Sequence, residues 1–302
     1  MRTGLFIGFI VLCGLSAVPL GAKTDVFVPQ QGFLIPNTLD TFTDNKEVAF
    51  VFQNPAGLAG ASQTQVKLDT SQDFFGYHQV SLATVFPTQE FTLGLGYFNF
   101  FTDDITRATK TDSTRPEAVG TFGHSVQTLT LSLAKRFHPE ITAGVMFQGL
   151  SQNLDSSSAF GYSADLGVIW TPYTQIWFGA YTQNLLNSGY QWSNSSRSES
   201  LPQRMVVSTG YRTYWMQTEL STDFTSYKLR AEYDLSDQLI FIGDILKEPA
   251  FTRYNYGIIL DLGSWSLQYN HLTNPDGLLQ YNQELFGICY RFGKQFPTYP
   301  LR

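Results

Sequence analysis

The stretch "AFGYSADLGVIW" (159–170) alternates between apolar or aromatic residues and small or polar ones. One face would carry Phe160, Tyr162, Ala164, Leu166, Val168 and Trp170, and the other Gly161, Ser163, Asp165, Gly167 and Ile169. A period of two predicts a β-strand whose faces meet different surroundings. Because the second face holds glycine and small polar residues, the strand is expected to separate an apolar environment from a polar interior.

The same period recurs along most of the chain. The stretches 90–101 and 140–150 show it most clearly, with Gly94, Gly96 and Gly144 on the polar face. Weaker alternation covers 62–68, 74–86, 126–135, 175–184, 204–211, 214–222, 226–234, 238–245, 253–261, 264–271 and 281–292. This gives about 14 segments, each close to the 9–11 residues of a tilted membrane strand.

The connections between these segments differ in length. Residues 136–140 and 171–174 form tight turns, whereas 102–122, 150–158 and 185–201 are expected to be long polar loops. Aromatic residues recur at segment ends, as in a membrane-interface belt. The sequence therefore predicts an all-β fold, a transmembrane antiparallel β-barrel of about 14 strands. A soluble β-sandwich is the alternative, since its strands alternate too.

The first 22 residues have the composition of a secretory signal peptide. Arg2 precedes the apolar run 5–18, and small residues follow up to Ala22, where cleavage is expected. A buried N-terminal helix is the alternative. The predicted mature chain holds one cysteine, Cys289, which leaves no intramolecular disulfide. A net charge of −6 and a pI near 5.2 argue against a nucleic-acid partner.

A turn-forming segment stands just ahead of the first predicted strand. In "FQNPAGLAG" (52–60), Pro55 has no N–H for a ladder and favours extended backbone at Asn54. Gly57 and Gly60 allow the backbone to turn and to approach neighbouring groups closely. These residues suit a turn packed closely against its neighbours, and the alternative is a loop that simply introduces the first strand.

Several motifs resemble the FadL superfamily of membrane channels, including its shorter PorV/PorQ-type members. The motifs are "NPAGLA" (54–59), "FTLGLGYFNFFTDDITR" (91–107), "YSADLGVIWTP" (162–172), "GAYTQNLLN" (179–187), "LRAEYDLSD" (229–237) and "YRFG" (290–293). Unlike PorV/PorQ-type chains, this one has "LIPNTLDTFTDNKEVAF" (34–50) where a Gly- and Ala-rich stretch is usual. That departure weakens the link to protein secretion.

The resemblance implies a domain organisation and a function. Residues 23–60 would form a hatch inside the barrel of residues 61–292, with Asn54, Pro55, Ala56 and Gly57 constricting the lumen. A tail (293–302) would follow. The implied function is passive uptake of small hydrophobic molecules, such as long-chain fatty acids, across the bacterial outer membrane. The alternative is a PorV/PorQ-like interaction protein that serves secretion or envelope assembly.

The resemblance also implies partners. They are outer-membrane lipid, a hydrophobic ligand or a secreted protein, and the barrel-assembly machinery. The last strand, "FGICYRFG" (286–293), resembles the terminal-strand signal that this machinery reads, because Phe286, Ile288, Tyr290 and Phe292 alternate and end on an aromatic ring.

Four charges share one face of the predicted strand 226–234. Lys228, Arg230, Glu232 and Asp234 alternate with apolar residues, and such a face is costly against lipid. We therefore expect it to face the lumen. The charges either line a polar path or, as the opposite charges at adjacent positions on this face favour, neutralise one another.

No pattern indicates catalysis, a metal or a cofactor. His78, His124, His138 and His271 lack metal-site spacing, and "GYSAD" (161–165) departs from a nucleophile elbow. The acidic "TDD" (102–104) lacks the alternating ligands of a calcium loop. The chain is accordingly predicted not to be an enzyme, although a serine hydrolase defined by geometry alone would escape this search.

Overall fold

The computed structural model describes residues 47–73, 76–109, 117–194, 198–249, 252–274 and 281–296 of the 302-residue chain. The predicted signal peptide (1–22), the first part of the predicted hatch (23–46) and the end of the predicted tail (297–302) lie outside these residues. Within them, two 3₁₀-helices come first, η1 (Glu47–Phe52) and η2 (Pro55–Gly60). None of the helices in the described chain is long and apolar enough to span a bilayer.

Strands make up almost all of the remaining regular structure. The first seven are β1 (Thr64–Asp73), β2 (His78–Pro87), β3 (Thr92–Thr109), β4 (Glu117–His138), β5 (Ile141–Leu154), β6 (Ser157–Tyr173) and β7 (Ile176–Gln183). Three short strands follow, β8 (Leu186–Asn187), β9 (Tyr190–Trp192) and β10 (Ser198–Glu199). The last seven are β11 (Arg204–Arg212), β12 (Met216–Thr222), β13 (Tyr227–Ser236), β14 (Leu239–Lys247), β15 (Thr252–Asp261), β16 (Trp265–Asn274) and β17 (Tyr281–Phe292).

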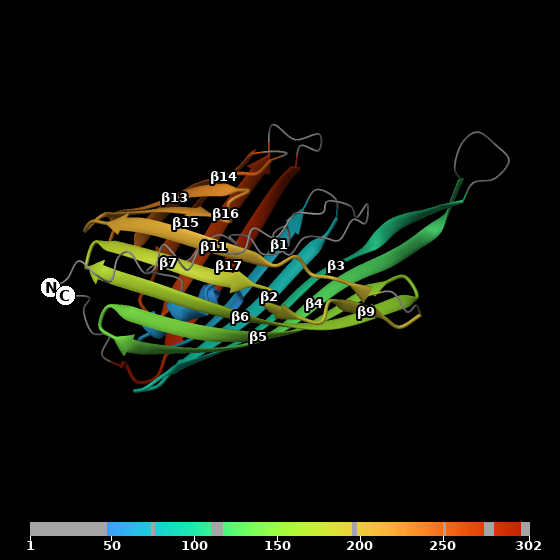
Figure 1. Cartoon of the computed structure of the whole chain (residues 1–302). Coiled ribbons are helices and arrows are strands. Elements are labelled where there is room, and N and C mark those ends of the chain that lie inside the picture. The colour runs from blue at the N-terminus through green and yellow to red at the C-terminus, as the bar shows by residue number, and fades with distance from the viewer. Residues whose placement is uncertain are drawn as a thin grey trace.

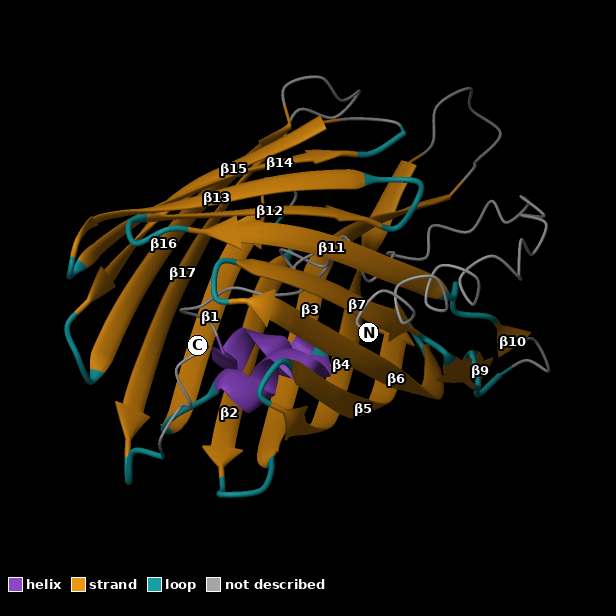
Figure 2. Ribbon diagram, turned by 60° about the vertical axis from the view of Figure 1, so that its left-hand side comes forward, coloured by secondary structure: helices purple, strands orange, loops and turns teal. Residues whose placement is uncertain are grey.

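The long strands pair in chain order and close into a ring. Each of β1 to β6 pairs with the next strand, β7 pairs with β11, and the order continues to β17. The ring closes where β17 lies antiparallel to β1, from Thr64–Phe292 to Asp73–Gln283. Over the described residues this is a closed 14-strand antiparallel β-barrel, as predicted, and Figures 1 and 2 show the strands wrapped around the two 3₁₀-helices.

The two faces of the wall have opposite chemistry. On β6, Phe160 and Tyr162 are 62% and 60% exposed, whereas Ser163 and Asp165 are each 2% exposed. Large apolar side chains such as Leu129 and Phe147 are likewise exposed on the outer face of β4 and β5. A soluble protein hides its apolar residues, so an apolar exterior around a polar interior indicates a wall that meets lipid.

The two ends of the barrel are built differently. At one end, called the short-turn end, strands are joined by the connections 88–91, 139–140, 174–175, 213–215, 237–238 and 262–264. The opposite end, called the long-loop end, carries the segment 184–203 with β8 to β10. This contrast confirms the predicted rhythm of short and long connections, although two of the predicted loops are absent.

The predictions of long loops at 102–122 and 150–158 are wrong. β3 continues to Thr109, β4 begins at Glu117, and a turn at 155–156 joins β5 directly to β6. Hydrophobic alternation marks only the lipid-facing part of a strand. Beyond it, polar residues extend the ladder without an apolar period, and most described side chains at the tip of the β3–β4 hairpin are exposed.

Strand lengths make the long-loop end uneven. β4 has 22 residues and β3 has 18, whereas β12 has 7 and β7 has 8. The long hairpins of β3–β6, together with β8–β10, form an extension that we call the ledge (Figure 1). Its own small core contains Leu150, Ala159, Tyr190 and Leu201. Arg107 also pairs with Asp155 across it at 2.6 Å.

Candidate functional site

The hatch residues that the structure describes lie inside the barrel, against the inner face of β2–β6 (Figure 2). Val51 and Leu58 are completely buried, and Phe50 is 2% exposed. They share one apolar cluster with wall residues that include Val85 and Phe98. The two 3₁₀-helices are therefore packed against one side of the lumen and occupy part of its cross-section.

Asn54 and Pro55 fix the start of η2. Asn54 is fully buried, and its Oδ1 accepts a hydrogen bond from the N–H of Ala56 at 3.1 Å. Its backbone carbonyl accepts from the N–H of Gly57 at 3.0 Å. Pro55 suits the first helical position, where no N–H partner is needed. The Asn54–Gly57 segment thus forms a capped turn inside the lumen rather than a bare connection outside it.

Glycines of the barrel wall make room for this turn. A β-carbon at Gly167 would overlap the Asn54 side chain, and one at Gly144 would lie 2.6 Å from the carbonyl carbon of Pro55. A β-carbon at Gly94 would come within 2.9 Å of the side chains of Val51 and Leu58. The glycines that the sequence placed on the inner face are therefore the points where the hatch backbone approaches the wall.

Three charged residues of β13 lie on the opposite wall and are buried. Lys228 and Arg230 are each 2% exposed and Glu232 is 4% exposed. Arg230 binds Glu232, with Nε and Oε1 2.9 Å apart. Its Nη1 also lies 3.7 Å from Asp244, which is 4.0 Å from the Lys228 ammonium. The predicted lumen face is occupied by an ion-paired network, as buried charges require.

Neighbouring strands complete this network. By register, Arg230 lies opposite Glu219 on β12 and Asp244 on β14, and Asp244 lies opposite Asn255 on β15. Asn255 donates a hydrogen bond to Asp244 at 2.7 Å. Asp234, the fourth predicted charge, is exposed at the short-turn end and is not one of the buried ion pairs. Glu219, Asp244 and Asn255 were not predicted, since only the strand register brings them together.

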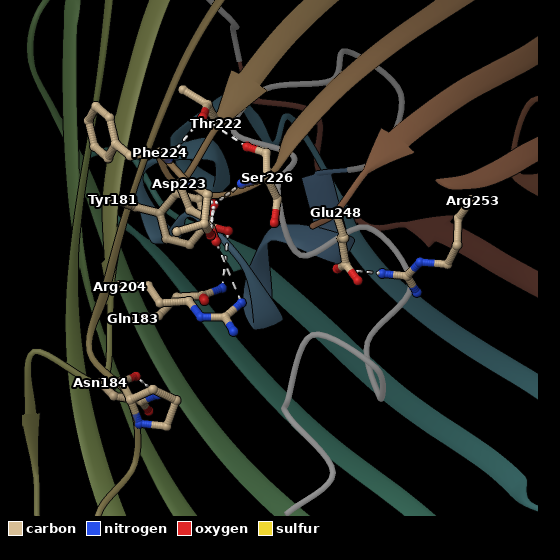
Figure 3. A network of polar contacts seen from close by, with 12 residues as sticks. Tyr181, Gln183, Asn184, Arg204, Thr222, Asp223, Phe224, Ser226, Glu248 and Arg253 are labelled. Carbon is tan, nitrogen blue, oxygen red and sulfur yellow. Dashed lines mark hydrogen bonds and ion pairs between the residues drawn. The ribbon is translucent and has the colours of Figure 1, made fainter. Parts of the chain in front are cut away.

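A second polar network lies at the long-loop end (Figure 3). Arg204 of β11 lies 3.6 Å from Asp223, in the turn between β12 and β13. Arg253 of β15 lies 3.3 Å from Glu248, in the connection after β14. Both pairs stand at the same end of the barrel, so this mouth is rimmed by charges already in contact with opposite charges.

The ladder between β6 and β7 is interrupted beside a buried carboxylate. Thr182 Oγ1 accepts from the N–H of Leu166 at 3.0 Å and replaces a backbone partner there. The Asp165 carboxylate accepts from the N–H of Leu185 at 3.3 Å. Between them Asn184 has φ +58°, a conformation that asparagine tolerates. Side-chain hydrogen bonds therefore replace the backbone ladder where β6 and β7 separate, and we call this place the seam.

Side chains that could bind a metal ion do not cluster in the part of the chain that the structure describes. No group of three or more His, Cys, Asp or Glu residues there could hold a metal ion. His271 lies 2.7 Å from Glu284, while His124 is buried beside Gln152 at 3.1 Å. Glu284 also accepts a hydrogen bond from the Tyr269 hydroxyl, and among the described residues neither histidine contact belongs to a group of three potential metal ligands.

Several solved structures superpose on this chain over most of its length. The Pseudomonas putida toluene transporter TodX superposes with a TM-score of 0.61 at 10% identity, over 84% of this chain and 95% of that one. The CymD monoaromatic hydrocarbon channel gives 0.61 at 10% identity, over 86% and 99%. A Pseudomonas aeruginosa FadL homologue gives 0.52 at 12% identity, over 85% and 96%.

The likeness is one of structure and not of sequence. No protein-family model matches the chain, and no curated protein matches it in sequence. The superposition nevertheless covers most of this chain and nearly all of each channel. The chain thus has the fold of the FadL-type barrels, as the sequence motifs predicted.

Proposed function

We propose that this protein is an outer-membrane channel that takes up small hydrophobic molecules without energy coupling. The observation that carries the proposal is the hatch, two 3₁₀-helices packed against the inner wall of a closed barrel. A general porin keeps a water-filled channel. A lumen narrowed by an apolar segment favours selective passage of apolar solutes instead. Two proteins that share the fold support this: TodX is a toluene transporter and CymD is a monoaromatic hydrocarbon channel.

The proposed path begins at the long-loop end and passes the hatch on the side away from β2–β6. The described hatch packs against β2–β6, so passage would run along the opposite wall, past the paired charges of β12–β15. Release would be sideways or into the periplasm. Long-chain fatty acids and aromatic hydrocarbons are the proposed substrates.

Orientation and export belong to the same proposal. Short turns face the periplasm in outer-membrane barrels, which places the long-loop end outside the cell. Cleavage after Ala22 would release the mature chain for insertion by the assembly machinery, and outer-membrane lipid would surround the wall. No catalytic step is proposed.

Uptake assays test this function. Deletion of the protein in a strain without related channels should reduce uptake of a radiolabelled fatty acid or toluene several-fold, and re-expression should restore it. Purified protein in liposomes should speed the entry of the same solute. Unchanged uptake in both assays would reject the proposal. The paired variants Gly167→Ala and Gly149→Ala then test whether the hatch controls the path.

The ledge supports a second candidate function, that of an interaction protein resembling the PorV/PorQ type. Its hairpins project beyond the barrel and pack on their own small core around Leu150 and Tyr190, which is a rigid platform for a partner protein. A chain lacking the ledge tip, with residues 103–122 replaced by a short turn, should then lose a co-purifying exported protein while the barrel still folds. Uptake without any such partner would favour the channel.

A further inference from the structure

The turn between β12 and β13 presents an aromatic side chain from a strained backbone. Phe224 has φ +69°, in the left-handed region where a bulky side chain clashes and glycine is the usual residue. The other non-glycine residues with positive φ in the described chain are Asp155 and Asn184, whose residue types tolerate it. The Phe224 side chain is 66% exposed, so packing within the described protein does not explain its presence.

Hydrogen bonds hold the turn in this conformation (Figure 3). Asp223 Oδ1 accepts from the backbone N–H groups of Thr225 at 3.0 Å and Ser226 at 2.7 Å. Thr222 Oγ1 accepts from the N–H of Phe224 at 2.8 Å and donates to the carbonyl of Ser226 at 2.8 Å. The strained residue therefore belongs to a fixed structure, and strain that a fixed structure maintains marks a place to look for function.

Phe224 and the charged residues near it lie on different sides of the β12–β13 turn. The side chain of Asp223 is 3% exposed and lies 3.6 Å from Arg204 at the mouth of the barrel. In Figure 3 the ring of Phe224 lies on the side of the turn away from Glu248 and Arg253. The turn thus places an ion pair on one side and an exposed aromatic ring on the other.

Strand length sets the height of this turn. β12 has only 7 residues, and the nine residue steps from Trp215 to Phe224, at about 3.3 Å each and a tilt of about 40°, rise about 23 Å. The apolar band of an outer-membrane barrel is about 25 Å tall. At the other end of the same hairpin, the rings of Trp215 and Tyr233 lie 5.2 Å apart, as in an interfacial belt. The β12–β13 turn then ends below the far surface of the bilayer.

We propose that this turn is a lip that lies within the outer leaflet, with Phe224 among the lipid acyl chains. The aromatic surface is then removed from water, and this offsets the strain of its backbone. Apolar molecules dissolved in the outer leaflet enter the barrel over the lip, past Asp223 and Arg204. The entry route rests on the proposed uptake function, whereas the position of the lip does not.

Quenching by spin-labelled lipids tests the position of the lip. A polarity-sensitive fluorophore is attached at Phe224→Cys in a Cys289→Ala chain, and the protein is inserted into phosphatidylcholine vesicles with a nitroxide on an upper acyl carbon. A second chain carries the label at Ser156→Cys, in the β5–β6 turn of the ledge. We expect strong quenching at position 224 and none at 156. Equal absence of quenching at both positions overturns the proposal.

An unlabelled variant tests the entry route. Phe224→Gly removes the strain and should leave the thermal midpoint in detergent unchanged or higher, but it should lower uptake of a membrane-dissolved hydrocarbon several-fold. Tyr214→Gly is the control, because Tyr214 is 94% exposed in a turn at the opposite end. Uptake equal to wild type in Phe224→Gly overturns the route. If the wild-type protein shows no uptake, the proposed function fails, and quenching alone still decides the position of the lip.

Discussion

Asn54 in the hatch lies directly over Gly167 of β6, so closely that any side chain at position 167 would overlap the Asn54 carboxamide. This contact joins the least regular part of the chain to one of its longest strands. It also means that a single methyl group can test how firmly the hatch is held.

Gly167→Ala should displace the hatch and loosen the closure of the lumen. Overpacking of this kind costs about 1–3 kcal/mol, so the thermal midpoint in detergent should fall. Single-channel conductance in planar bilayers should rise, because the hatch no longer fits its wall. Gly149→Ala on neighbouring β5 is the matched control, since nothing lies within 4 Å of a β-carbon there. Equal behaviour of the two variants would show that the hatch is not held by this contact.

Asn54→Ala should weaken the start of η2 without filling any space. The variant loses the hydrogen bond from the N–H of Ala56, and loss of such a cap costs about 1 kcal/mol. We expect a small fall in thermal midpoint together with larger fluctuations in channel current. Asn54→Asp keeps the acceptor oxygen and should restore part of the cap at the cost of a buried charge. Current fluctuations equal to those of the wild type in Asn54→Ala would show that the cap does not determine how firmly the hatch closes the lumen.

Arg230→Met should be among the most destabilising substitutions in the wall. It leaves the carboxylates of Glu232 and Asp244 buried without their guanidinium partner, a change that costs about 3–5 kcal/mol. Urea unfolding in lipid vesicles would measure the loss. Asp234→Asn is the control on the same strand, because that carboxylate is exposed and its change should stay within about 0.5 kcal/mol. Similar losses of unfolding free energy in both variants would show that burial does not determine the cost of removing a charge.

Thr182→Val should open the seam between β6 and β7. The variant keeps the shape of the side chain but removes the hydroxyl that accepts from the N–H of Leu166. Hydrogen exchange at Leu166 should then become at least tenfold faster, while exchange in β3 and β4 stays unchanged. Thr209→Val on β11 is a comparison, because the Thr209 hydroxyl donates to a backbone carbonyl in an intact ladder. Unchanged exchange at Leu166 would mean that another group closes the seam.

The period of the sequence was sufficient to predict the barrel. Successive side chains of a strand point to opposite faces, so apolar residues such as Phe160 and Tyr162 alternate with polar ones such as Ser163. This pattern can be read from one strand without knowing its neighbouring strands. The glycines that receive the hatch were visible for the same reason. The extension of β3 and β4 beyond Thr102 was missed because most of its described side chains are exposed, which leaves no apolar period.

The composition of the charged network could not be predicted from one strand. Lys228, Arg230 and Glu232 share a face by local geometry, but Glu219 and Asp244 reach them only through the pairing of β12 and β14 with β13. A shift of one residue in that register would send the partners to the opposite face. The register of each strand depends on the pairing of all the strands around the barrel, so it could not be read from the sequence of one strand.

Closure of the ring between β1 and β17 constrains the order of assembly. The strands that close the barrel come from opposite ends of the chain: Gln283 donates to Ser71, 212 residues away, at 2.7 Å. The hatch, which precedes β1, is enclosed by the finished wall and seated on glycines of β3, β5 and β6. It therefore has to dock while the sheet is still open. An open sheet of β2–β6 with the hatch in place is the expected late intermediate, and the final zipping of β17 onto β1 locks the hatch inside.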